Sequence, residues 1–290
     1  MNAIAQALAQ MPHVGRGVYA PADFEAVREI AYQDAGIVLP PGKAVLVYSR
    51  LAPLLRQRGY TNFAAYVKHI QRDEKERRRA ICALTTNHTF FFRENHHFEH
   101  LAKQVRPKLV DRAVAGEPIR LWSAGCASGE ETWSIVMTLL GPDRGAGRSL
   151  AAKDVRVLAT DIADHALKAA EAGIYASDSM EAVPAILRTA WTTEQVGQVT
   201  MSKYARAIVR FRSLNLLKDW PMRGEFDVIF CRNVMIYFDQ PTKERLIKRF
   251  ADQLAPGGFL YIGHSERVTG SAASMLQVAG PTIYQRGGRT

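Results

Sequence analysis

Several features that define other classes of protein are absent from this chain of 290 residues. No apolar run approaches the roughly 20 residues that a membrane-spanning helix needs, and residues 1–10 lack the basic and apolar regions of a signal peptide. The three cysteines, Cys82, Cys126 and Cys231, form no CxxC pair, and the eight histidines include no HExxH motif. We therefore expect a cytoplasmic protein with reduced, buried thiols and neither a zinc site nor a disulfide.

Acidic residues are also scarce relative to basic ones. The chain has 28 Asp and Glu against 38 Lys and Arg, which gives a net charge of +10. This excess suits nucleic acid, an anionic surface or an acidic protein partner, and charge alone does not distinguish among them. With 47% hydrophobic and 23% charged residues, the composition is otherwise that of a globular chain with a substantial core.

The amino-terminal part of the chain has a helical pattern. Residues 1–20 show little periodicity, and we expect a flexible lead-in there. Three apolar stripes at helical spacing follow in residues 21–84, which predicts a small all-helical domain. Thr61 is the expected N-cap of the third helix, and Pro53 should kink or restart the second. The mixed charges of residues 72–79 predict a solvated helix face.

After residue 117, short β-rich runs alternate with helical stretches. This alternation predicts an α/β fold with a parallel, doubly wound sheet. Residues 175–207 interrupt it and are too many for an ordinary loop, so we expect a small subdomain inserted into the sheet. The expected strands are 119–123, 155–160, 208–211, 227–232, 259–262 and one near 282–285; the expected helices are 130–140, 164–172 and 243–254, the last with Thr242 as its cap.

The first expected strand runs into a segment of small residues, SAGCASG at 123–129. Such residues allow a backbone to approach a ligand closely at the carboxyl end of a strand. The helix N-terminus behind them favours an anionic group, such as the carboxylate of a bound amino acid. A tight turn without a ligand remains the alternative for this segment.

The second expected strand ends in Asp161. A carboxylate at this place can bind two vicinal ribose hydroxyls, a device that nicotinamide-binding folds also use. However, the chain contains no GxGxxG motif, and Asp161 lies 36 residues after Gly125 rather than about 20. This spacing disfavours a dehydrogenase, and a helix N-cap remains the structural alternative for Asp161.

The fourth expected strand is apolar and ends abruptly in Arg232 and Asn233. These polar groups would lie at the carboxyl edge of the sheet, where ligands bind. Enzymes that methylate amino groups of nucleic acids commonly carry an Asn/Asp-Pro-Pro-aromatic motif at this place, which this chain lacks. The absence of this motif weakens the inference that the positive net charge serves to bind nucleic acid.

Five segments of the chain, taken in their order, are shared with one known family. They are TTNHTFFFRE at 85–94, AGCASGEE at 124–131, ATDI at 159–162, CRNVMIYF at 231–238 and GHSE at 263–266. With them the chain resembles the CheR-type chemotaxis receptor methyltransferases over nearly its whole length from about residue 20. The resemblance implies a Rossmann-like class I methyltransferase domain at 118–290, with the inserted subdomain, preceded by the helical domain and by a linker and helix at 85–117.

The resemblance also implies a cofactor, S-adenosylmethionine, with S-adenosylhomocysteine as its product, and a set of site residues. Arg93 and Tyr237 are implied as the catalytic pair, nearest the departing methyl group. The implied cofactor-binding residues are Asn87, Thr89 and Arg93 from the linker, Glu131 at the amino-acid part, Asp161 at the ribose, Asn215 and Leu216 at the adenine, and Arg232 and Asn233 on the methionine side. Thr89 could be only a cap and Tyr237 only a core aromatic residue, and a structural role is expected for His264 and Glu266.

As a function, the resemblance implies methyl transfer to glutamate side chains of chemoreceptors. The partner would be the cytoplasmic helical region of the receptors, and we expect a monomer that neither binds nucleic acid nor inserts into the membrane. A helix thought to dock on receptors carries Arg50, Arg56 and Arg58 here, with Pro53 and Leu54 where further basic residues can occur. A methyltransferase of another substrate, including nucleic acid, a non-catalytic cofactor-binding signalling module and a nicotinamide enzyme stay open as alternatives.

Some members of that family bind a receptor's C-terminal pentapeptide as an added strand on the inserted subdomain, aided by a glycine-containing turn. Here residues 191–211 contain Gly197 as their only glycine. This stretch is a few residues shorter than the corresponding stretch of the family members that bind the pentapeptide. Strand addition needs an exposed, well-formed edge. We therefore predict that this chain does not depend on the pentapeptide.

Overall fold

The computed structural model describes residues 17–288, so most of the expected lead-in lies outside the described residues. The chain divides into two compact units. One holds the described residues up to Thr86 together with Tyr237–Thr242, and the other holds Asn87–Ile236 and the described residues from Lys243 onward. Among the described residues, no helix is both long and apolar enough to span a bilayer.

Helices build the first unit, as its apolar periodicity predicts. They are α2 (Pro21–Ala35), the short η1 (Pro41–Lys43), α3 (Ala44–Gln57), α4 (Phe63–Arg72) and α5 (Glu74–Leu84). Phe24, Leu51, Phe63 and Tyr66, one or two from each of α2, α3 and α4, are fully buried in the core. The apolar stripes of these helices therefore face one another.

The structure corrects two local predictions for this unit. The helix α3 continues through Pro53 to Gln57 and does not restart, so of the two expected alternatives the kink stays a prediction. The helix α4 begins at Phe63, so its N-cap is Asn62, whose side chain accepts a hydrogen bond from the Ala65 amide at 2.9 Å. Thr61 lies one residue too far from the helix to cap it, because a cap must reach an amide two or three residues inside.

The charged run at 72–79 is not only a solvated face, because Glu76 is 1% exposed. Its Oε2 accepts hydrogen bonds from Arg58 Nε at 2.9 Å and Nη2 at 2.5 Å, and its Oε1 accepts one from the Tyr66 hydroxyl at 3.1 Å. Burial raises the pKa of this carboxyl, but the bonds from Arg58 and Tyr66 bring it below its ordinary value. A charged Glu76 thus connects α5 to α4 and to the end of α3.

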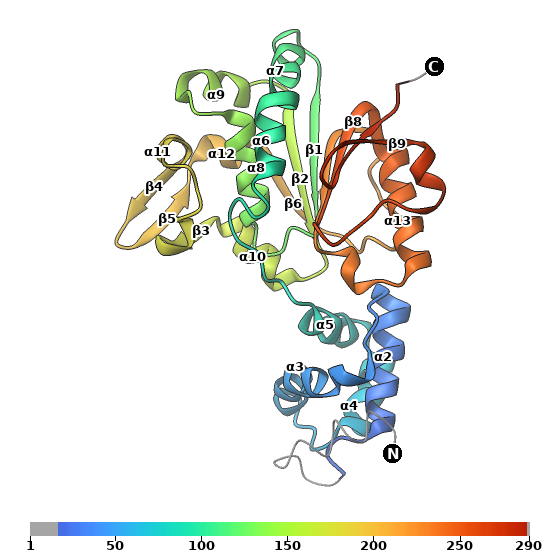
Figure 1. Ribbon diagram of the computed structural model, residues 1–290. Helices are drawn as coiled ribbons and strands as arrows, with labels where there is room; N and C mark the ends of the chain where they lie inside the picture. The colour runs from blue at the N-terminus through green and yellow to red at the C-terminus, as the bar shows by residue number, and fades with distance from the viewer. Residues whose placement is uncertain (1–16, 289–290) are drawn as a thin grey trace. The chain divides into compact units, whose positions relative to one another are not determined.

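A seven-stranded sheet forms the centre of the second unit, in the order β6-β2-β1-β7-β8-β10-β9 (Figure 1). The first five strands in this order pair in parallel, whereas β10 is antiparallel to both neighbours. The strands are β1 (Ile119–Ala124), β2 (Val155–Asp161), β6 (Val209–Ser213), β7 (Phe226–Cys231), β8 (Leu254–Ile262), β9 (Leu276–Gly280) and β10 (Ile283–Arg286). All six predicted strands are present, and the predicted α/β fold is confirmed.

The structure corrects this part of the prediction at three places. Strand β9 was not expected, because its middle residues are exposed and show no apolar alternation. Strand β8 begins before the expected residue 259, with a shift in its register against β7. The helix α13 (Gln240–Gln253) also begins early, so the Asp239 carboxylate, and not Thr242, takes the cap position by accepting the Thr242 amide at 2.9 Å.

Helices cover one face of the parallel strands. They are α6 (His96–His100), the π-helical η2 (Leu101–Val105), α7 (Arg106–Val114), α8 (Glu130–Leu140), α9 (Arg144–Ala151) and α10 (Asp164–Ala172). Figure 1 shows α6, α7 and α8 in front of β1 and β2. Leu101, Trp133 and Val157 are at most 1% exposed within the core between helices and sheet.

A second, smaller sheet interrupts the alternation, as expected for an inserted subdomain. It is antiparallel, in the order β3-β5-β4. Its elements are β3 (Ile174–Ala176), η3 (Asp178–Met180), α11 (Ala185–Trp191), β4 (Thr192–Gln195), β5 (Gln198–Met201) and α12 (Lys203–Ala207). Val196 and Gly197 join β4 to β5 with φ of +47° and +73°, as a two-residue type I′ turn requires.

Candidate active site

Four neighbouring parallel strands bring the candidate residues to one edge of the sheet. In the order β6-β2-β1-β7, the residues at or just after the carboxyl ends of these strands are Asn215, Asp161, Gly125 and Arg232. Ligands of open α/β sheets bind at this edge. The segments are far apart in sequence, so only the pairing of the strands assembles them.

Packing within the chain explains the two glycines of the loop after β1. Gly125 and Gly129 have φ of +83° and +99°. A Cβ on Gly125 would lie 2.3 Å from Val234 Cγ2, and one on Gly129 would lie 2.7 Å from Ala170 Cβ. Substitution is therefore both strained and sterically blocked at these places, and a ligand is not needed to account for the glycines.

Asp161 connects this loop to the end of β2. The residue is 8% exposed. Its Oδ2 accepts a hydrogen bond from the Ala127 amide and its Oδ1 accepts one from the Ala163 amide, both at 2.8 Å. Burial raises the pKa of the carboxyl, and hydrogen bonds from these two amides and from the Ile162 amide counteract that effect. The cap position of α10 is Ala163, so Asp161 is not its N-cap. A carboxylate can accept about four hydrogen bonds, so three backbone amides leave some capacity for a ribose hydroxyl.

Asn215 and Leu216 follow β6 at the same end of the sheet. The Leu214 amide donates to the Asp161 carbonyl at 3.0 Å, which holds this segment beside the end of β2. The Asn215 side chain accepts the Leu217 amide at 2.9 Å, and Leu216 is buried. The segment thus lies beside the end of β2, and the contact of Asn215 and Leu216 with the adenine stays a prediction.

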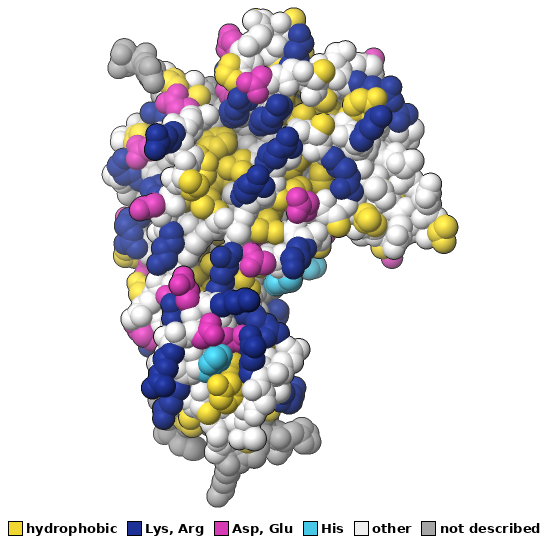
Figure 2. All heavy atoms as spheres, turned by 180° about the vertical axis from the view of Figure 1, so that it is seen from behind, with side chains coloured by type: hydrophobic (Ala, Val, Ile, Leu, Met, Phe, Trp, Pro, Cys, Tyr) yellow, Lys and Arg dark blue, Asp and Glu magenta, His cyan; other side chains and the backbone are white. Residues whose placement is uncertain are grey.

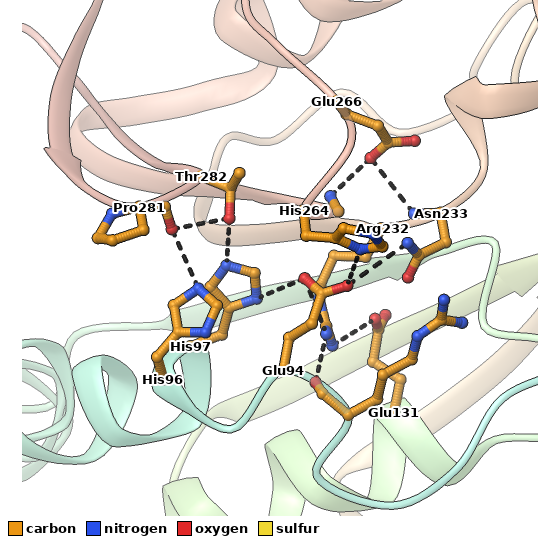
Figure 3. A network of polar contacts seen from close by, with 12 residues as sticks. Glu94, His96, His97, Glu131, Arg232, Asn233, His264, Glu266, Pro281 and Thr282 are labelled. Atoms are coloured by element: carbon orange, nitrogen blue, oxygen red, sulfur yellow. Dashed lines mark hydrogen bonds and ion pairs between the residues drawn. The ribbon is translucent and has the colours of Figure 1, made fainter.

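Arg232, at the end of β7, is the centre of a buried polar network (Figure 3). Its side chain is 2% exposed. Nη1 lies 3.2 Å from Glu131 Oε2, and Nη2 lies 3.4 Å from Glu94 Oε2 and donates to the Arg93 carbonyl. One buried positive charge between two carboxylates satisfies the strong pairing requirement of buried ions, and it attaches the linker to the sheet.

Glu131 is held on its other side by Ser123. The Ser123 hydroxyl donates to Glu131 Oε1 at 2.8 Å, so both carboxylate oxygens have a partner. Burial raises the pKa of this carboxyl, and the charge of Arg232 counteracts the rise. The position of Glu131 in the first turn of α8 also places its negative charge at the favourable end of the helix dipole.

Glu94 is the main residue of this network that the sequence did not identify. His264 Nδ1 lies 3.1 Å and Asn233 Nδ2 lies 3.5 Å from its Oε1, as Figure 3 shows. Burial raises the pKa of the Glu94 carboxyl, but Arg232 and His264 bring it below the ordinary value. Glu94 and Asn233 have φ of +57° and +58°, and such strain gathers at functional sites. Position 94 stands in the shared linker segment, but nothing local reveals its partners.

Two residues near the network have structural roles. Burial lowers the pKa of His97 to about 3, so this imidazole is neutral, and its Nε2 lies 2.9 Å from Thr282 Oγ1. Glu266 accepts the amides of Gly263 at 2.6 Å and Asn233 at 3.3 Å. Glu266 therefore holds two backbone segments together, in keeping with the structural role expected for it.

The linker contributes side chains with free capacity. Asn87 Nδ2 lies 3.2 Å from His165 Nε2 of α10, and Thr89 is half-buried without a side-chain hydrogen bond to any described residue. The Arg93 guanidinium donates to the His88 carbonyl at 3.3 Å. Within residues 17–288, no carboxylate lies at ion-pair distance from Arg93. Its charge is available to an anionic group.

Tyr237 belongs to the other compact unit, with η4 (Met235–Tyr237) at the boundary. Its hydroxyl lies 3.5 Å from the Thr86 carbonyl oxygen, and its own carbonyl accepts the Val38 amide at 2.8 Å. The joint catalytic role of Arg93 and Tyr237 stays a prediction.

Two of the three arginines implied for receptor docking have partners within their unit. Arg58 bonds to Glu76 as described above, and Arg50 Nη1 lies 3.3 Å from the Thr85 carbonyl. Arg56 is exposed. Of the three arginines, Arg58 is the one with an ion pair inside the described part of the unit, since two of its N–H groups donate to Glu76.

Two family models match the chain nearly from end to end. One, described as the CheR methyltransferase SAM binding domain, covers residues 87–284, and the other, its all-alpha domain, covers residues 22–85. The chain belongs to the CheR methyltransferase family. Its cofactor is S-adenosylmethionine.

Curated relatives agree with this assignment. A probable chemotaxis protein methyltransferase of Rhizobium etli is 43% identical, over 88% of this chain and 96% of its own length. Chemotaxis protein methyltransferase 2 of Pseudomonas aeruginosa is 40% identical, over 92% and 93%. The chemotaxis protein methyltransferase of Escherichia coli is 38% identical, over 91% and 90%.

The residues of this CheR-family chain fit the cofactor. Asp161 and Glu131 are each 8% exposed at the sheet edge, where carboxylates can meet hydroxyl and ammonium groups. Buried polar atoms without a hydrogen-bond partner among the described residues include Arg232 Nε and Thr132 Oγ1, the latter in the first turn of α8. The first amides of α8 also lack acceptors within the helix, as at any helix start, and suit a carboxylate.

Proposed function

We propose that this chain transfers a methyl group from S-adenosylmethionine to glutamate side chains of chemoreceptors and forms glutamate methyl esters. The observation that carries the proposal is Arg93. It places an unpaired guanidinium on the linker whose backbone Arg232 fastens to the cofactor edge of the sheet. Relatives named chemotaxis protein methyltransferase support the receptor as the substrate.

The acceptor needs no activation by a base. A glutamate carboxylate is already ionised at neutral pH, so the protein has only to align it and to remove water from it. When bound, S-adenosylmethionine supplies the electrophilic methyl group. Among the described residues, no carboxylate lies at ion-pair distance from Arg93, so none competes with the incoming carboxylate for its guanidinium.

Each polar residue of the site then has a distinct task. Arg93 holds the acceptor carboxylate through charge-assisted hydrogen bonds, and Tyr237 donates a hydrogen bond or shapes the path of the methyl group. Asp161 binds the ribose hydroxyls, and Glu131 binds the amino-acid part of the cofactor. Arg232 fixes the linker so that Arg93 returns to the same position in each turnover.

The product removes one negative charge from the receptor for each ester formed. A chain with net charge +10 is attracted to an acidic helical surface, and release becomes easier as that surface is neutralised. We propose the cytoplasmic helical region of the receptors as the partner, and therefore the cytoplasm as the site of action.

Methyl transfer from labelled cofactor to receptor cytoplasmic fragments and to RNA tests this function. We expect label in the receptor fragment and rapid loss of that label in mild base, because esters hydrolyse far faster than N-methyl groups. Base-stable label, or label in RNA alone, would contradict the proposal and favour a methyltransferase of another substrate.

A further inference from the structure

One face of the sheet is exposed at the strands β2 and β6. Parallel strands are ordinarily covered on both faces. On this face Leu158 of β2 pairs with Arg210 of β6, and Thr160 pairs with Arg212. Arg156, two residues before Leu158, points the same way, and all three arginines are exposed while Leu158 is half-buried.

The exposure has a cause in the connection from β6 to β7. Residues 214–225, all of them described, form no helix, so this crossover supplies no helix that could cover β2 and β6. Cover from α13 extends as far as β1. There Trp122 packs against Trp220 at 4.8 Å and Phe250 at 5.3 Å between ring centroids.

The three arginines, Arg156, Arg210 and Arg212, form a cationic row that is named here the arginine face. Each guanidinium donates through Nη1 to the carbonyl of the preceding residue, at 2.7 Å. Over the part of the chain that the structure describes, none forms an ion pair. The neighbouring Asp154 is already bonded to Arg120 at 2.8 Å.

The three arginine side chains do more than cover the apolar surface of the strands. The stem of an arginine can lie on Leu158 and shield it from water. Nε and Nη2 of each guanidinium nevertheless remain available as donors, since a guanidinium has five N–H groups. Figure 2 shows Lys and Arg side chains lying across areas of hydrophobic side chains on this side of the molecule.

We propose that the arginine face is a docking surface for an acidic, amphipathic helix of the receptor, outside the glutamate that is methylated. This inference rests on the proposed function. Charge complementarity selects the occupant, since three unpaired guanidinium groups surround a partly exposed apolar side chain.

The spacing of the row fits a helix. Arg210 and Arg212 are two residues apart on one strand, which places their Cα atoms about 6.6 Å apart. Acidic residues one turn apart on a helix, at i and i+4, are separated by about 6 Å along its axis. Two neighbouring carboxylates of a helix can therefore reach two neighbouring guanidinium groups of β6.

Single-stranded RNA fits this face less well. RNA recognition of this kind needs exposed aromatic rings on which bases stack. Trp122, which pairs with Leu158, is buried, and the ring of the neighbouring Trp220 is covered by Arg249 at 4.0 Å and packed against Trp122. The apolar Leu158 offers nothing to a phosphate backbone, whereas it can contact the apolar side of a helix.

Neutralising the arginine face is the test. The variant Arg156→Gln/Arg210→Gln/Arg212→Gln should raise the KM for a receptor cytoplasmic fragment about tenfold, as expected for three exposed ion pairs. Its affinity for S-adenosylhomocysteine and its melting temperature should stay those of the wild type. The control Lys108→Gln/Arg144→Gln/Lys168→Gln removes the same charge from exposed positions on α7, α9 and α10 and should leave the KM within about twofold.

The outcomes separate this inference from the proposed function. A wild-type protein that methylates no receptor fragment removes both. If the wild type methylates the fragment and the arginine variant has an unchanged KM, only the docking surface is refuted. An equal rise of KM in the control, or loss of RNA binding with an unchanged receptor KM, would also overturn the docking surface.

Discussion

Asp161 and Arg93 differ in how far the protein itself already uses their side chains. The Asp161 carboxylate accepts two backbone amides, whereas the Arg93 guanidinium bonds only to one backbone carbonyl and lies 5.7 Å from the Phe90 ring centroid. Loss of the first side chain must therefore affect local structure as well as binding. Loss of the second should affect binding and chemistry alone.

Asp161→Ala should weaken binding of S-adenosylhomocysteine by about 100-fold or more, since two charge-assisted hydrogen bonds are each worth about 1.5–3 kcal/mol. It should also lower the free energy of unfolding by about 1–3 kcal/mol, because the Ala127 and Ala163 amides lose their acceptor. Calorimetric titration and denaturation measure the two effects. The control is Asp143→Ala, which removes the cap of α9 and should lower stability without changing the affinity for S-adenosylhomocysteine. An unchanged affinity in Asp161→Ala would refute the assignment of Asp161 to the ribose.

Arg93→Ala should lower kcat about 100-fold, the scale found when one electrostatic donor is removed from a reacting centre. Stability should change by less than about 0.5 kcal/mol, because the side chain forms no ion pair with a described residue. Arg93→Lys should restore only part of the rate, since an ammonium lacks the planar fork. Methyl incorporation equal to the wild type in Arg93→Ala would remove Arg93 from the mechanism.

At the scale of elements, the buried carboxylate of Glu76 connects α5 to α4 and to the end of α3. Glu76 has a pKa below its ordinary value of 4.5 in the folded protein. A group of this kind adds stability at pH values above 4.5, and the gain disappears as pH falls through the folded-state pKa. The connection of α5 to α4 should therefore weaken in acid.

Glu76→Gln should lower the local stability of α4 and α5 at pH 7 by about 1–3 kcal/mol, since it weakens bonds to Arg58 and Tyr66. It should also remove most of the loss of stability below pH 4.5. Hydrogen exchange of the amides in these helices measures both quantities. Glu74→Gln is the matched control, because Glu74 is exposed in the same helix; equal behaviour of the two variants would exclude a special role for Glu76.

The inserted subdomain allows a test of receptor tethering. Its hairpin has four residues in each strand and a two-residue turn, with Thr193, Glu194 and Gln195 of the outer strand β4 exposed. Glu194 is also bonded to Arg188 and Ser177. We predict no detectable heat when a receptor-tail pentapeptide ending in an aromatic residue is titrated to millimolar concentration. Micromolar binding would show that this edge accepts an added strand.

At the scale of the whole molecule, the net charge of +10 should govern encounter with an acidic receptor. Raising the ionic strength from about 0.05 to 0.3 M shortens the Debye length from about 14 to 6 Å. The KM for a receptor fragment should then rise several-fold. Affinity for S-adenosylhomocysteine, measured in the same buffers, should change little because this ligand carries no net charge; a salt-independent KM would exclude electrostatic attraction.

Much of this molecule could be predicted from the sequence because the relevant signals are local. Short runs of β-forming residues predicted β1, β2 and β7, and the helical stretches between the runs predicted α8 and α10. The position of Asp161 at the end of a strand also follows from the sequence alone, since strand and motif are contiguous there. The errors also have local causes. Two neighbouring polar residues could cap α4, and Asn62 rather than Thr61 does so. The strand β9 is exposed and has no apolar periodicity that would have predicted it.

What only the tertiary structure decided involves residues far apart in the chain. Glu94, Glu131, Arg232 and His264 meet because the linker, α8, β7 and the segment after β8 converge at one sheet edge. Pairing between strands that are far apart in the sequence depends on the packing of the whole domain. No single segment of the chain encodes it. For the same reason, the sequence predicted the sheet but not its exposed face, because whether a crossover covers its neighbours is settled only when the whole chain has packed.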